Sequence, residues 1–207
     1  MNKYIVTIIL LLLILVTAYF SFYFYSMKNV KEPKYIVSKK NENIEVRVYK
    51  PMIIAEVSLS GNANDTINSG FRLLADYIFG NNISMTTPVT QQKATKISMT
   101  APVMQQQSDK QKWNIQFVMP EEYTLKSLPK PNNNQVKIRQ VSPKTMVAIQ
   151  FFGSRSKELI KKNTGVLKEY IKARQLKVIG EPLFAFYNPP WTLPFMKRNE
   201  IMYELFE

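Results

Sequence analysis

The hydrophobic pattern divides the chain into an apolar N-terminal segment and a longer amphipathic remainder. Residues 4–25 carry no charged side chain, and their centre is a run of isoleucine and leucine. A helix needs about 20 apolar residues to cross the hydrocarbon core of a bilayer. The aromatic stretch at residues 19–25 suits the headgroup interface. The pattern therefore predicts a single membrane-spanning anchor at residues 1–27.

Two properties of this segment are left open by the sequence. A cleaved secretory signal is the alternative to a retained anchor, although the apolar run is long for a signal and no small-residue cleavage site follows it. Lysines after the span, among them Lys28, Lys31 and Lys34, favour a cytoplasmic domain by the positive-inside rule. A short basic start before a long apolar run is also typical of translocated, N-terminally anchored domains.

The rest of the chain carries strand-like and helix-like patterns in turn. Residues 28–43 are polar and predict a linker, and one domain is expected over residues 44–207. The first two strands, separated by Pro51, are interpreted as a hairpin. Alternation of apolar and polar positions predicts strands at residues 44–49, 52–59, 113–119, 136–141, 145–152, 183–187 and 201–206.

Two stripes of apolar positions at helical spacing predict two amphipathic helices. An Asn or Asp within residues 62–65 can cap the first helix, and Gly80 can end it. Gly70 inside this helix costs about 1 kcal/mol relative to Ala, which predicts a close packing partner. The order of the predicted elements is strand, strand, helix and further strands, and this order occurs twice along the chain. It predicts an α+β domain with a partly closed antiparallel sheet and two packed helices. The stripes consist of Ile67, Phe71, Leu74 and Ile78, and of Ile160, Thr164, Leu167 and Ile171.

Composition removes several classes of chemistry and points to an anionic partner. The chain of 207 residues contains no Cys and no His, which excludes disulfides, Cys/His zinc sites and Ser-His-Asp catalysis. It has 28 basic and 15 acidic residues, a net charge of +13. Six basic residues in and just after the second predicted helix favour contact with anionic lipid, with a solvated helix face as the alternative. Nucleic acid is not an expected partner, because no recognition motif is present.

A seven-residue motif occurs twice, with an offset of 14 residues. Ile-Ser-Met-Thr-Thr-Pro-Val at residues 83–89 recurs as Ile-Ser-Met-Thr-Ala-Pro-Val at residues 97–103. The repeat predicts two adjacent strands in which each Pro lies at a strand end or bulge, because Pro cannot donate a ladder hydrogen bond.

These motifs and four others in the same order resemble the SOUL haem-binding protein family. Lys197 stands where the family usually has Arg, and the middle Ser of the family's FSG turn is absent at residues 152–153. The resemblance covers residues 44–207. The other motifs are YIFGNN at residues 77–82, WNIQFVMP at 113–120, LPKP at 128–131 and YNPPWTLPFMKRNE at 187–200.

The resemblance implies a distorted antiparallel β-barrel of about eight strands with two packed helices, built from two similar halves. It also implies non-catalytic binding of haem or another tetrapyrrole, for buffering or delivery at a membrane. Some family members use a His as axial ligand and many do not. Because this chain contains no His, it would bind haem without a His ligand. Binding of another amphipathic anion, such as a lipid or hydrophobic effector, and a scaffold without ligand are the alternatives.

A porphyrin is a flat apolar disc with two carboxylates on one edge, so its site needs an apolar slot with cations at the mouth. Core packing is the favoured alternative for the apolar members of the predicted site. A structural latch is the favoured role of the closing motif, with Trp191 as an aromatic plug. No pair of carboxylates has a spacing suited to catalysis, so no catalytic residue and no metal site are predicted. The predicted binding residues are Phe71, Arg72, Leu74, Ile78, Met85, Met99, Lys197 and Arg198.

Overall fold

The computed structural model describes residues 3–28, 30–80 and 96–206, and the chain forms two compact units, residues 1–30 and 31–207. The first unit is helix α1 (Lys3–Met27), which contains an 18-residue window with a mean hydropathy of 2.7. By length and composition this helix can cross a membrane. A signal sequence near an N-terminus meets the same criterion.

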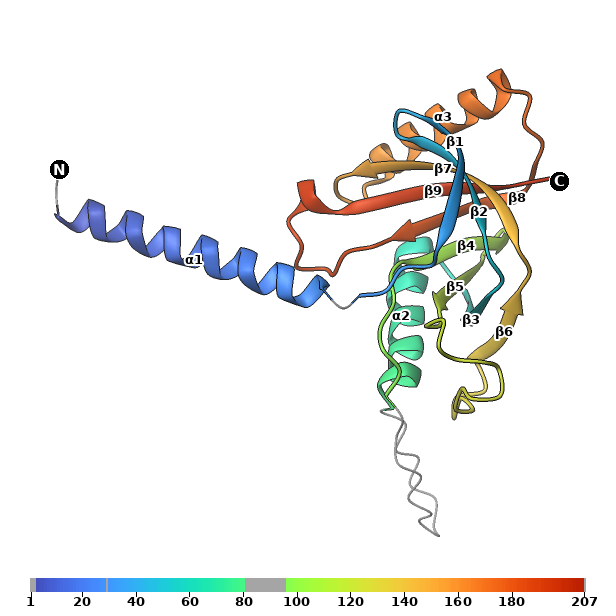
Figure 1. Ribbon diagram of the computed structural model, residues 1–207, viewed down its shortest axis with the longest axis horizontal. Coiled ribbons are helices and arrows are strands. Elements are labelled where there is room, and N and C mark those ends of the chain that lie inside the picture. Colours follow the sequence, from blue (N-terminus) through green and yellow to red (C-terminus); the bar gives the residue numbers. More distant parts are fainter. Residues whose placement is uncertain (1–2, 29, 81–95, 207) are drawn as a thin grey trace, which may run out of the picture. The chain divides into compact units, whose positions relative to one another are not determined.

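The second unit is an antiparallel sheet with two packed helices, which Figure 1 shows curled into a partial barrel. Its strand order is β1-β2-β7-β9-β8-β4-β5-β3-β6. The predicted α+β fold class is confirmed. The strands are β1 (Tyr35–Asn41), β2 (Ile44–Tyr49), β3 (Met52–Ser60), β4 (Val103–Asp109), β5 (Lys112–Val118), β6 (Lys137–Val141), β7 (Lys144–Phe152), β8 (Val178–Phe186) and β9 (Arg198–Leu205), and the helices are α2 (Ala63–Phe79), α3 (Lys157–Ala173) and the short 3-10 helix η1 (Pro194–Met196).

Strand pairing shows that the domain consists of two equivalent halves. In the first half, β3 and β4 flank β5, and in the second, β7 and β8 flank β9. The first strand of each half pairs with a strand of the other half. In the first half this strand is β2, which pairs with β7, and in the second half it is β6, which pairs with β3. The two halves meet where β4 pairs with β8. Each half therefore depends on the other for one strand.

This exchange overturns the predicted hairpin of residues 44–49 and 52–59. Strand β2 pairs with β1 and β7, whereas β3 pairs with β5 and β6. Alternating hydrophobicity identifies a half-buried strand but carries no information about its partner. The two strands diverge at the corner that contains Pro51, and each completes a different half of the sheet.

The segment for which a linker was predicted, residues 28–43, contains strand β1. Residues 35–41 pair with β2 over its whole length, and most of their side chains are exposed. The strand joins the edge of the sheet through backbone hydrogen bonds, which do not require an apolar pattern. Polar composition therefore concealed it.

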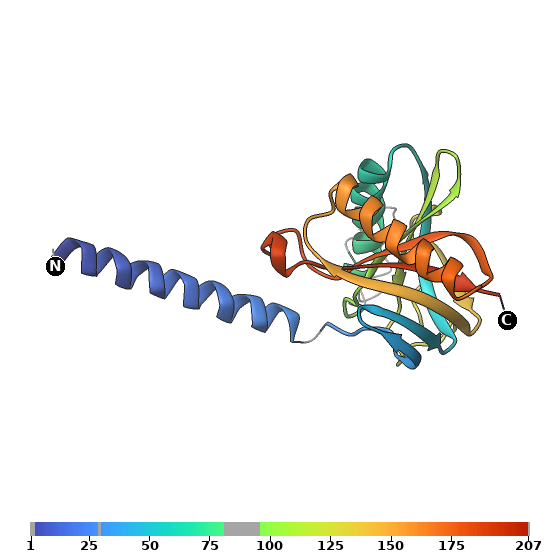
Figure 2. The same ribbon diagram turned by 90° about the horizontal axis from the view of Figure 1, so that it is seen from above.

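The two helices begin and end as the sequence indicates. Asn62 caps α2 by accepting a hydrogen bond from the Asp65 backbone, and Gly80 ends it in the left-handed conformation at φ 69°. Ser156 caps α3 in the same way through Leu159. Helix α2 packs on β3 and β5, and α3 packs on β7 and β9 (Figure 2).

One face of the sheet carries the hydrophobic core beneath the helices. Below α2 this core includes Val57, Ile115 and Phe117, and below α3 it includes Ile149 and Ile201. The strand registers place all five on the same face of the sheet. The residues between them in sequence, such as Gln116 and Glu200, consequently lie on the opposite, helix-free face.

The closer approach of α2 to the sheet at Gly70 predicts opposite effects of one substitution in the two helices. A Cβ atom at Gly70 would lie 2.8 Å from side-chain atoms of the buried Ile115, whereas a Cβ at Gly165 of α3 meets no atom within 4 Å. We expect Gly70→Ala to lower the free energy of unfolding by about 1–3 kcal/mol through overpacking. Gly165→Ala should raise it by roughly 0.5–1 kcal/mol through helix propensity. Urea denaturation followed by near-UV circular dichroism measures both, and a Gly70→Ala variant as stable as the parent chain would contradict the packing argument.

Candidate functional site

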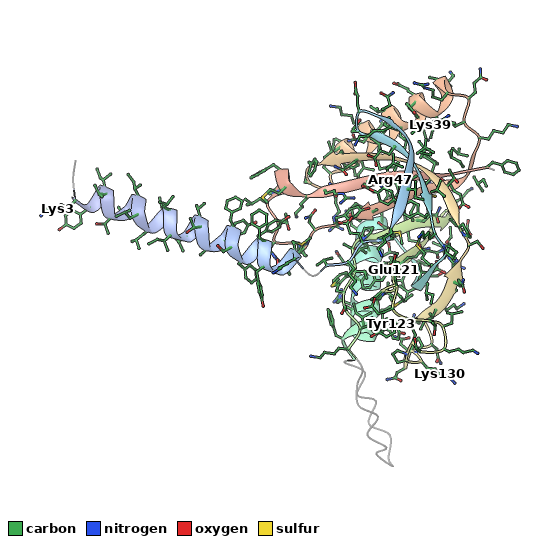
Figure 3. The ribbon with its side chains drawn as sticks, in the orientation of Figure 1. Lys3, Lys39, Arg47, Glu121, Tyr123 and Lys130 are labelled. Carbon is green, nitrogen blue, oxygen red and sulfur yellow. The ribbon has the colours of Figure 1, made fainter. Side chains whose placement is uncertain are left out.

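A buried ion pair lies on the helix-free face of the sheet. Arg47 of β2 is 1% exposed and Glu200 of β9 is fully buried. The Arg47 guanidinium donates two hydrogen bonds to the Glu200 carboxylate, of 2.7 and 3.2 Å, and a third of 2.8 Å to Glu45. Figure 3 shows Arg47 within the second unit. Its side chain reaches across β7, where the residue beside Glu45 in the register is the small Ala148.

Two more residues complete the coordination of the Glu200 carboxylate. The hydroxyl of Tyr187 donates to it over 2.8 Å, and Arg198 donates over 2.9 Å. The Arg198 guanidinium also stacks 3.8 Å from the centre of the Tyr187 ring and donates to Glu32 over 3.1 Å. This cluster joins the first strands of the domain to β9 and to the segment that precedes β1.

The surroundings raise the pKa values of Arg47, Tyr49 and Tyr187, so all three stay protonated near neutral pH. Burial lowers the pKa of Arg47, but its hydrogen bonds to Glu200 and the charge of Glu200 outweigh burial and raise that pKa above its ordinary value. Burial raises the pKa of Tyr49, which accepts a hydrogen bond from Arg47, to about 12. Burial and the charge of Glu200 raise the pKa of Tyr187 well above 10.0.

This cluster is suited to a structural role rather than to proton transfer. Both Glu200 oxygens accept a hydrogen bond from Arg47, one of them also accepts from Arg198 and the other from Tyr187, so a general acid or base function would require breaking these bonds. Within residues 3–28, 30–80 and 96–206, no group of three or more Asp or Glu side chains lies close enough to hold a metal ion. The predicted latch function of Arg198, Asn199 and Glu200 agrees with this geometry, and Asn199 donates to the carbonyls of Gly153 and Lys197.

A large cleft opens beside this cluster. Its volume is about 970 Å³, near the upper end of the roughly 300–1,000 Å³ typical of small-molecule sites. Three segments form its walls: residues 31–34 before β1, residues 50–53 at the β2–β3 corner, and residues 118–126 after β5. The apolar part of the lining comprises Pro33, Pro51, Met52, Ile53, Val118, Met119, Pro120, Tyr123 and Leu125.

Charged side chains surround the apolar walls of the cleft. Lys31 pairs with Glu122 at 2.7 Å and Lys34 pairs with Glu121 at 2.6 Å, so these ion pairs join the segment before β1 to the loop after β5. Exposed pairs of this kind contribute at most about 1 kcal/mol each. The remaining two lysines of the lining, Lys50 and Lys126, form no ion pair with any residue that the structure describes.

A smaller cavity of about 90 Å³ lies on the helix-free face and shares Pro33 and Met52 with the cleft. Its volume corresponds to about three water molecules, at roughly 30 Å³ each. A tetrapyrrole cannot enter a space of this size. Four methionines from four strands line it: Met52, Met104, Met146 and Met202.

Most apolar residues of the predicted binding site lie in the core. Leu74 and Ile78 lie on the buried face of α2, and Phe71 packs against Phe117 with ring centres 5.5 Å apart. Met99 is partly buried against the same core cluster. Arg72 is exposed on α2, and the predicted Met85 lies outside the described residues.

The two remaining predicted residues lie at the start of β9. Lys197 donates to the carbonyl of Pro190 over 3.0 Å, and Arg198 belongs to the buried cluster. Of the predicted residues that the structure describes, none lines the large cleft or the smaller cavity. The cleft residues went unnoticed in the sequence because they come from separate loops and strand ends, where no periodic pattern marks them. The one available signal was the MP pair at residues 119–120, which lies in the cleft wall.

Comparison with protein families identifies the chain. The model of the SOUL heme-binding protein family matches residues 30–204. The chain belongs to the SOUL family. The match includes residues 35–41, so strand β1 is part of the family domain, as the structure also shows. No curated protein matches the chain.

Solved structures share the fold of this SOUL protein at low sequence identity. The C-terminal domain of EcmrR is 11% identical, and the alignment covers 79% of this chain and 97% of that one with a TM-score of 0.56. A hydrolase from Listeria innocua is 13% identical, with 86% and 93% of the chains covered and a TM-score of 0.52. Identities this low establish the shared fold alone.

The buried cluster predicts that the fold depends strongly on Glu200. Replacing Glu200 by Gln leaves Arg47 without a full counter-charge, which should lower the free energy of unfolding by about 3–5 kcal/mol. Glu121→Gln is the matched control, because Glu121 pairs with Lys34 where both side chains are mostly exposed, and its loss should cost no more than about 1 kcal/mol. Urea denaturation measures both, and equal losses in the two variants would refute the central role of the buried pair.

The buried tyrosines predict a loss of stability at high pH. Because the folded-state pKa values of Tyr49 and Tyr187 lie above 10.0, their contribution is fully present below pH 10.0 and is lost as pH rises toward and beyond 12. In that window each should reduce the free energy of unfolding by about 1.4 kcal/mol per pH unit. The double variant Tyr49→Phe/Tyr187→Phe should show a shallower decline in denaturation curves recorded from pH 9 to 12. An unchanged slope would show that neither group titrates in this range.

Proposed function

We propose that this SOUL protein binds haem or another tetrapyrrole in the cleft of about 970 Å³, without catalysing a reaction. The observation that carries the proposal is the combination of apolar walls with two cations, Lys50 and Lys126, that form no ion pair among the described residues. A porphyrin places its propionates on one edge of an apolar disc. Lysine ammonium groups are suitable partners for those carboxylates, and the apolar side chains suit its faces.

The residues of the cleft fit a tetrapyrrole better than they fit a strongly ligated iron. Met52 and Met119 offer thioethers and Tyr123 offers a phenol, whereas the chain contains no His. A thioether alone is a weak iron ligand, and phenolate ligation occurs in some haem proteins. Binding would therefore rest mainly on apolar contact and propionate pairing, and iron-free tetrapyrroles should bind with similar strength.

A second location is the site predicted from the sequence, which includes Phe71 and Arg72 of α2. This site needs the core residues Leu74 and Ile78 to face a ligand, although both are buried against the sheet. The cleft needs no such rearrangement. We therefore favour the cleft, and the experiment below separates the two locations.

Retention of α1 as an anchor would hold the cleft at a membrane surface. The residues 31–34 that line the cleft follow the end of α1 after only three intervening residues, 28–30. Buffering or delivery of an amphipathic tetrapyrrole at the membrane is consistent with this connection. The exposed lysines of α3, among them Lys161, Lys168 and Lys172, are suited to contact with anionic lipid.

A haemin titration with charge-reversal variants tests the cleft. Haemin added to the full chain in lipid nanodiscs should give a saturable Soret band at about one equivalent. Lys50→Glu/Lys126→Glu should weaken binding at least about tenfold by losing two propionate partners and adding repulsion, which corresponds to 1.4 kcal/mol. Lys130→Glu is the matched control, since Lys130 is exposed on the same loop region (Figure 3) but does not line the cleft.

Two further variants distinguish the cleft from the predicted site. Leu125→Glu places a charge in the apolar wall of the cleft. Arg72→Glu/Lys197→Glu reverses two of the three cations of the predicted site, and the third, Arg198, is kept because it belongs to the buried cluster. Weakening by the first variant alone supports the cleft, whereas weakening by the second alone assigns the ligand to the predicted site. A flat titration of the parent chain, alongside displacement of a bound lipid or dye, would favour another amphipathic ligand instead.

A further inference from the structure

The loop between β8 and β9 exposes large aromatic side chains. Trp191 is 57% exposed and Phe195 is 69% exposed. This exposure contradicts the expectation that Trp191 plugs the interior of the domain. We call residues 188–197 the aromatic loop. An exposed Trp beside an exposed Phe on one short loop is uncommon on a soluble surface and is typical of interaction sites.

The aromatic loop is held in shape by several contacts. The Thr192 amide donates to the Pro189 carbonyl over 3.1 Å, and the Lys197 side chain donates to the Pro190 carbonyl over 3.0 Å. At the base of the loop, Asn188 accepts a hydrogen bond from the Arg198 amide over 2.7 Å. The two aromatic side chains are therefore displayed by a fixed backbone, and little conformational entropy is lost when they are buried.

The exposed aromatic surface continues onto the end of β7. Phe152 is 55% exposed, and the neighbouring Gly153 donates to the carbonyl of Lys197 over 3.0 Å. Asn199 donates to the Gly153 carbonyl over 2.9 Å. The base of the aromatic loop and Phe152 thus belong to one region of the domain.

An ion pair joins this region to the segment that connects the domain to α1. Arg198, which directly follows the aromatic loop, pairs with Glu32 at 3.1 Å. An extended chain spans at most about 3.6 Å per residue, so the five steps from Met27 to Glu32 cover no more than roughly 18 Å. Covalent geometry alone therefore keeps the base of the aromatic loop close to whatever surface the end of α1 reaches.

We propose that the aromatic loop docks the domain onto the bilayer that α1 spans, with Trp191 and Phe195 in the headgroup interface. Aromatic side chains, and Trp above all, prefer that interface because they combine an apolar body with a polar edge. The inference rests on the proposed anchoring by α1. It adds a second contact with the same membrane, and this contact fixes the orientation of the domain and of the cleft beside it.

The two tryptophans of the chain provide a direct test. Trp113→Phe leaves Trp191 as the single fluorophore, and Trp191→Phe leaves Trp113, which packs against the core of β5 and α2. Trp113 is partly buried in β5, whereas Trp191 is 57% exposed, so Trp113 serves as the internal control.

Each variant, as the full chain, is reconstituted into phosphatidylcholine vesicles with and without bromine on the upper acyl chain. We expect bromine to quench Trp191 while leaving the fluorescence of Trp113 unchanged. Flotation of the vesicles establishes that the chain is inserted. An inserted chain with unquenched Trp191, or with equal quenching of both tryptophans, would overturn the docking proposal.

The haemin titration separates this inference from the proposed function. A chain that fails to float refutes the anchor and the docked loop together, while binding in the cleft can still be measured. A chain that floats with Trp191 quenched but shows no saturable haemin binding supports docking and rejects the tetrapyrrole assignment.

Discussion

The buried ion pair between Arg47 and Glu200 is the constraint on which the domain depends. It joins the leading strand of the first half to the last strand of the second, across the point where the two halves exchange strands. Two charges in a dry interior are tolerable only when each is fully coordinated. Tyr187 and Arg198 complete that coordination, so the closing motif of the chain and strand β2 must be positioned together.

The same cluster connects the fold to the two candidate functions. Arg198 reaches from the cluster to Glu32, and the segment around Glu32 forms one wall of the cleft. The aromatic loop ends at Lys197, directly before Arg198. The cleft, the aromatic loop and the connection to α1 are therefore all linked to one buried cluster.

The chain belongs to the SOUL heme-binding protein family and contains no His, so a His ligand to a haem iron is excluded. Apolar enclosure and propionate pairing are available in the cleft, whereas imidazole ligation is not. The ion pairs Lys31–Glu122 and Lys34–Glu121 link the walls of the cleft by exposed contacts that are individually weak. These two ion pairs therefore contribute little to the stability of the cleft walls.

The sequence by itself determined the α+β class, an Asn or Asp cap within residues 62–65, the helix end at Gly80 and the close contact of Gly70, because these features follow from local patterning and from backbone chemistry. It also determined the family, through motifs that need no folded context. Only the tertiary structure decided which of the three candidates caps α2, that β2 and β3 pair with different strands, that a polar segment supplies β1, and that the cleft is lined by segments distant in sequence. Periodicity records which side of an element is buried, and the partner of that side is fixed by long-range pairing that leaves no local signal.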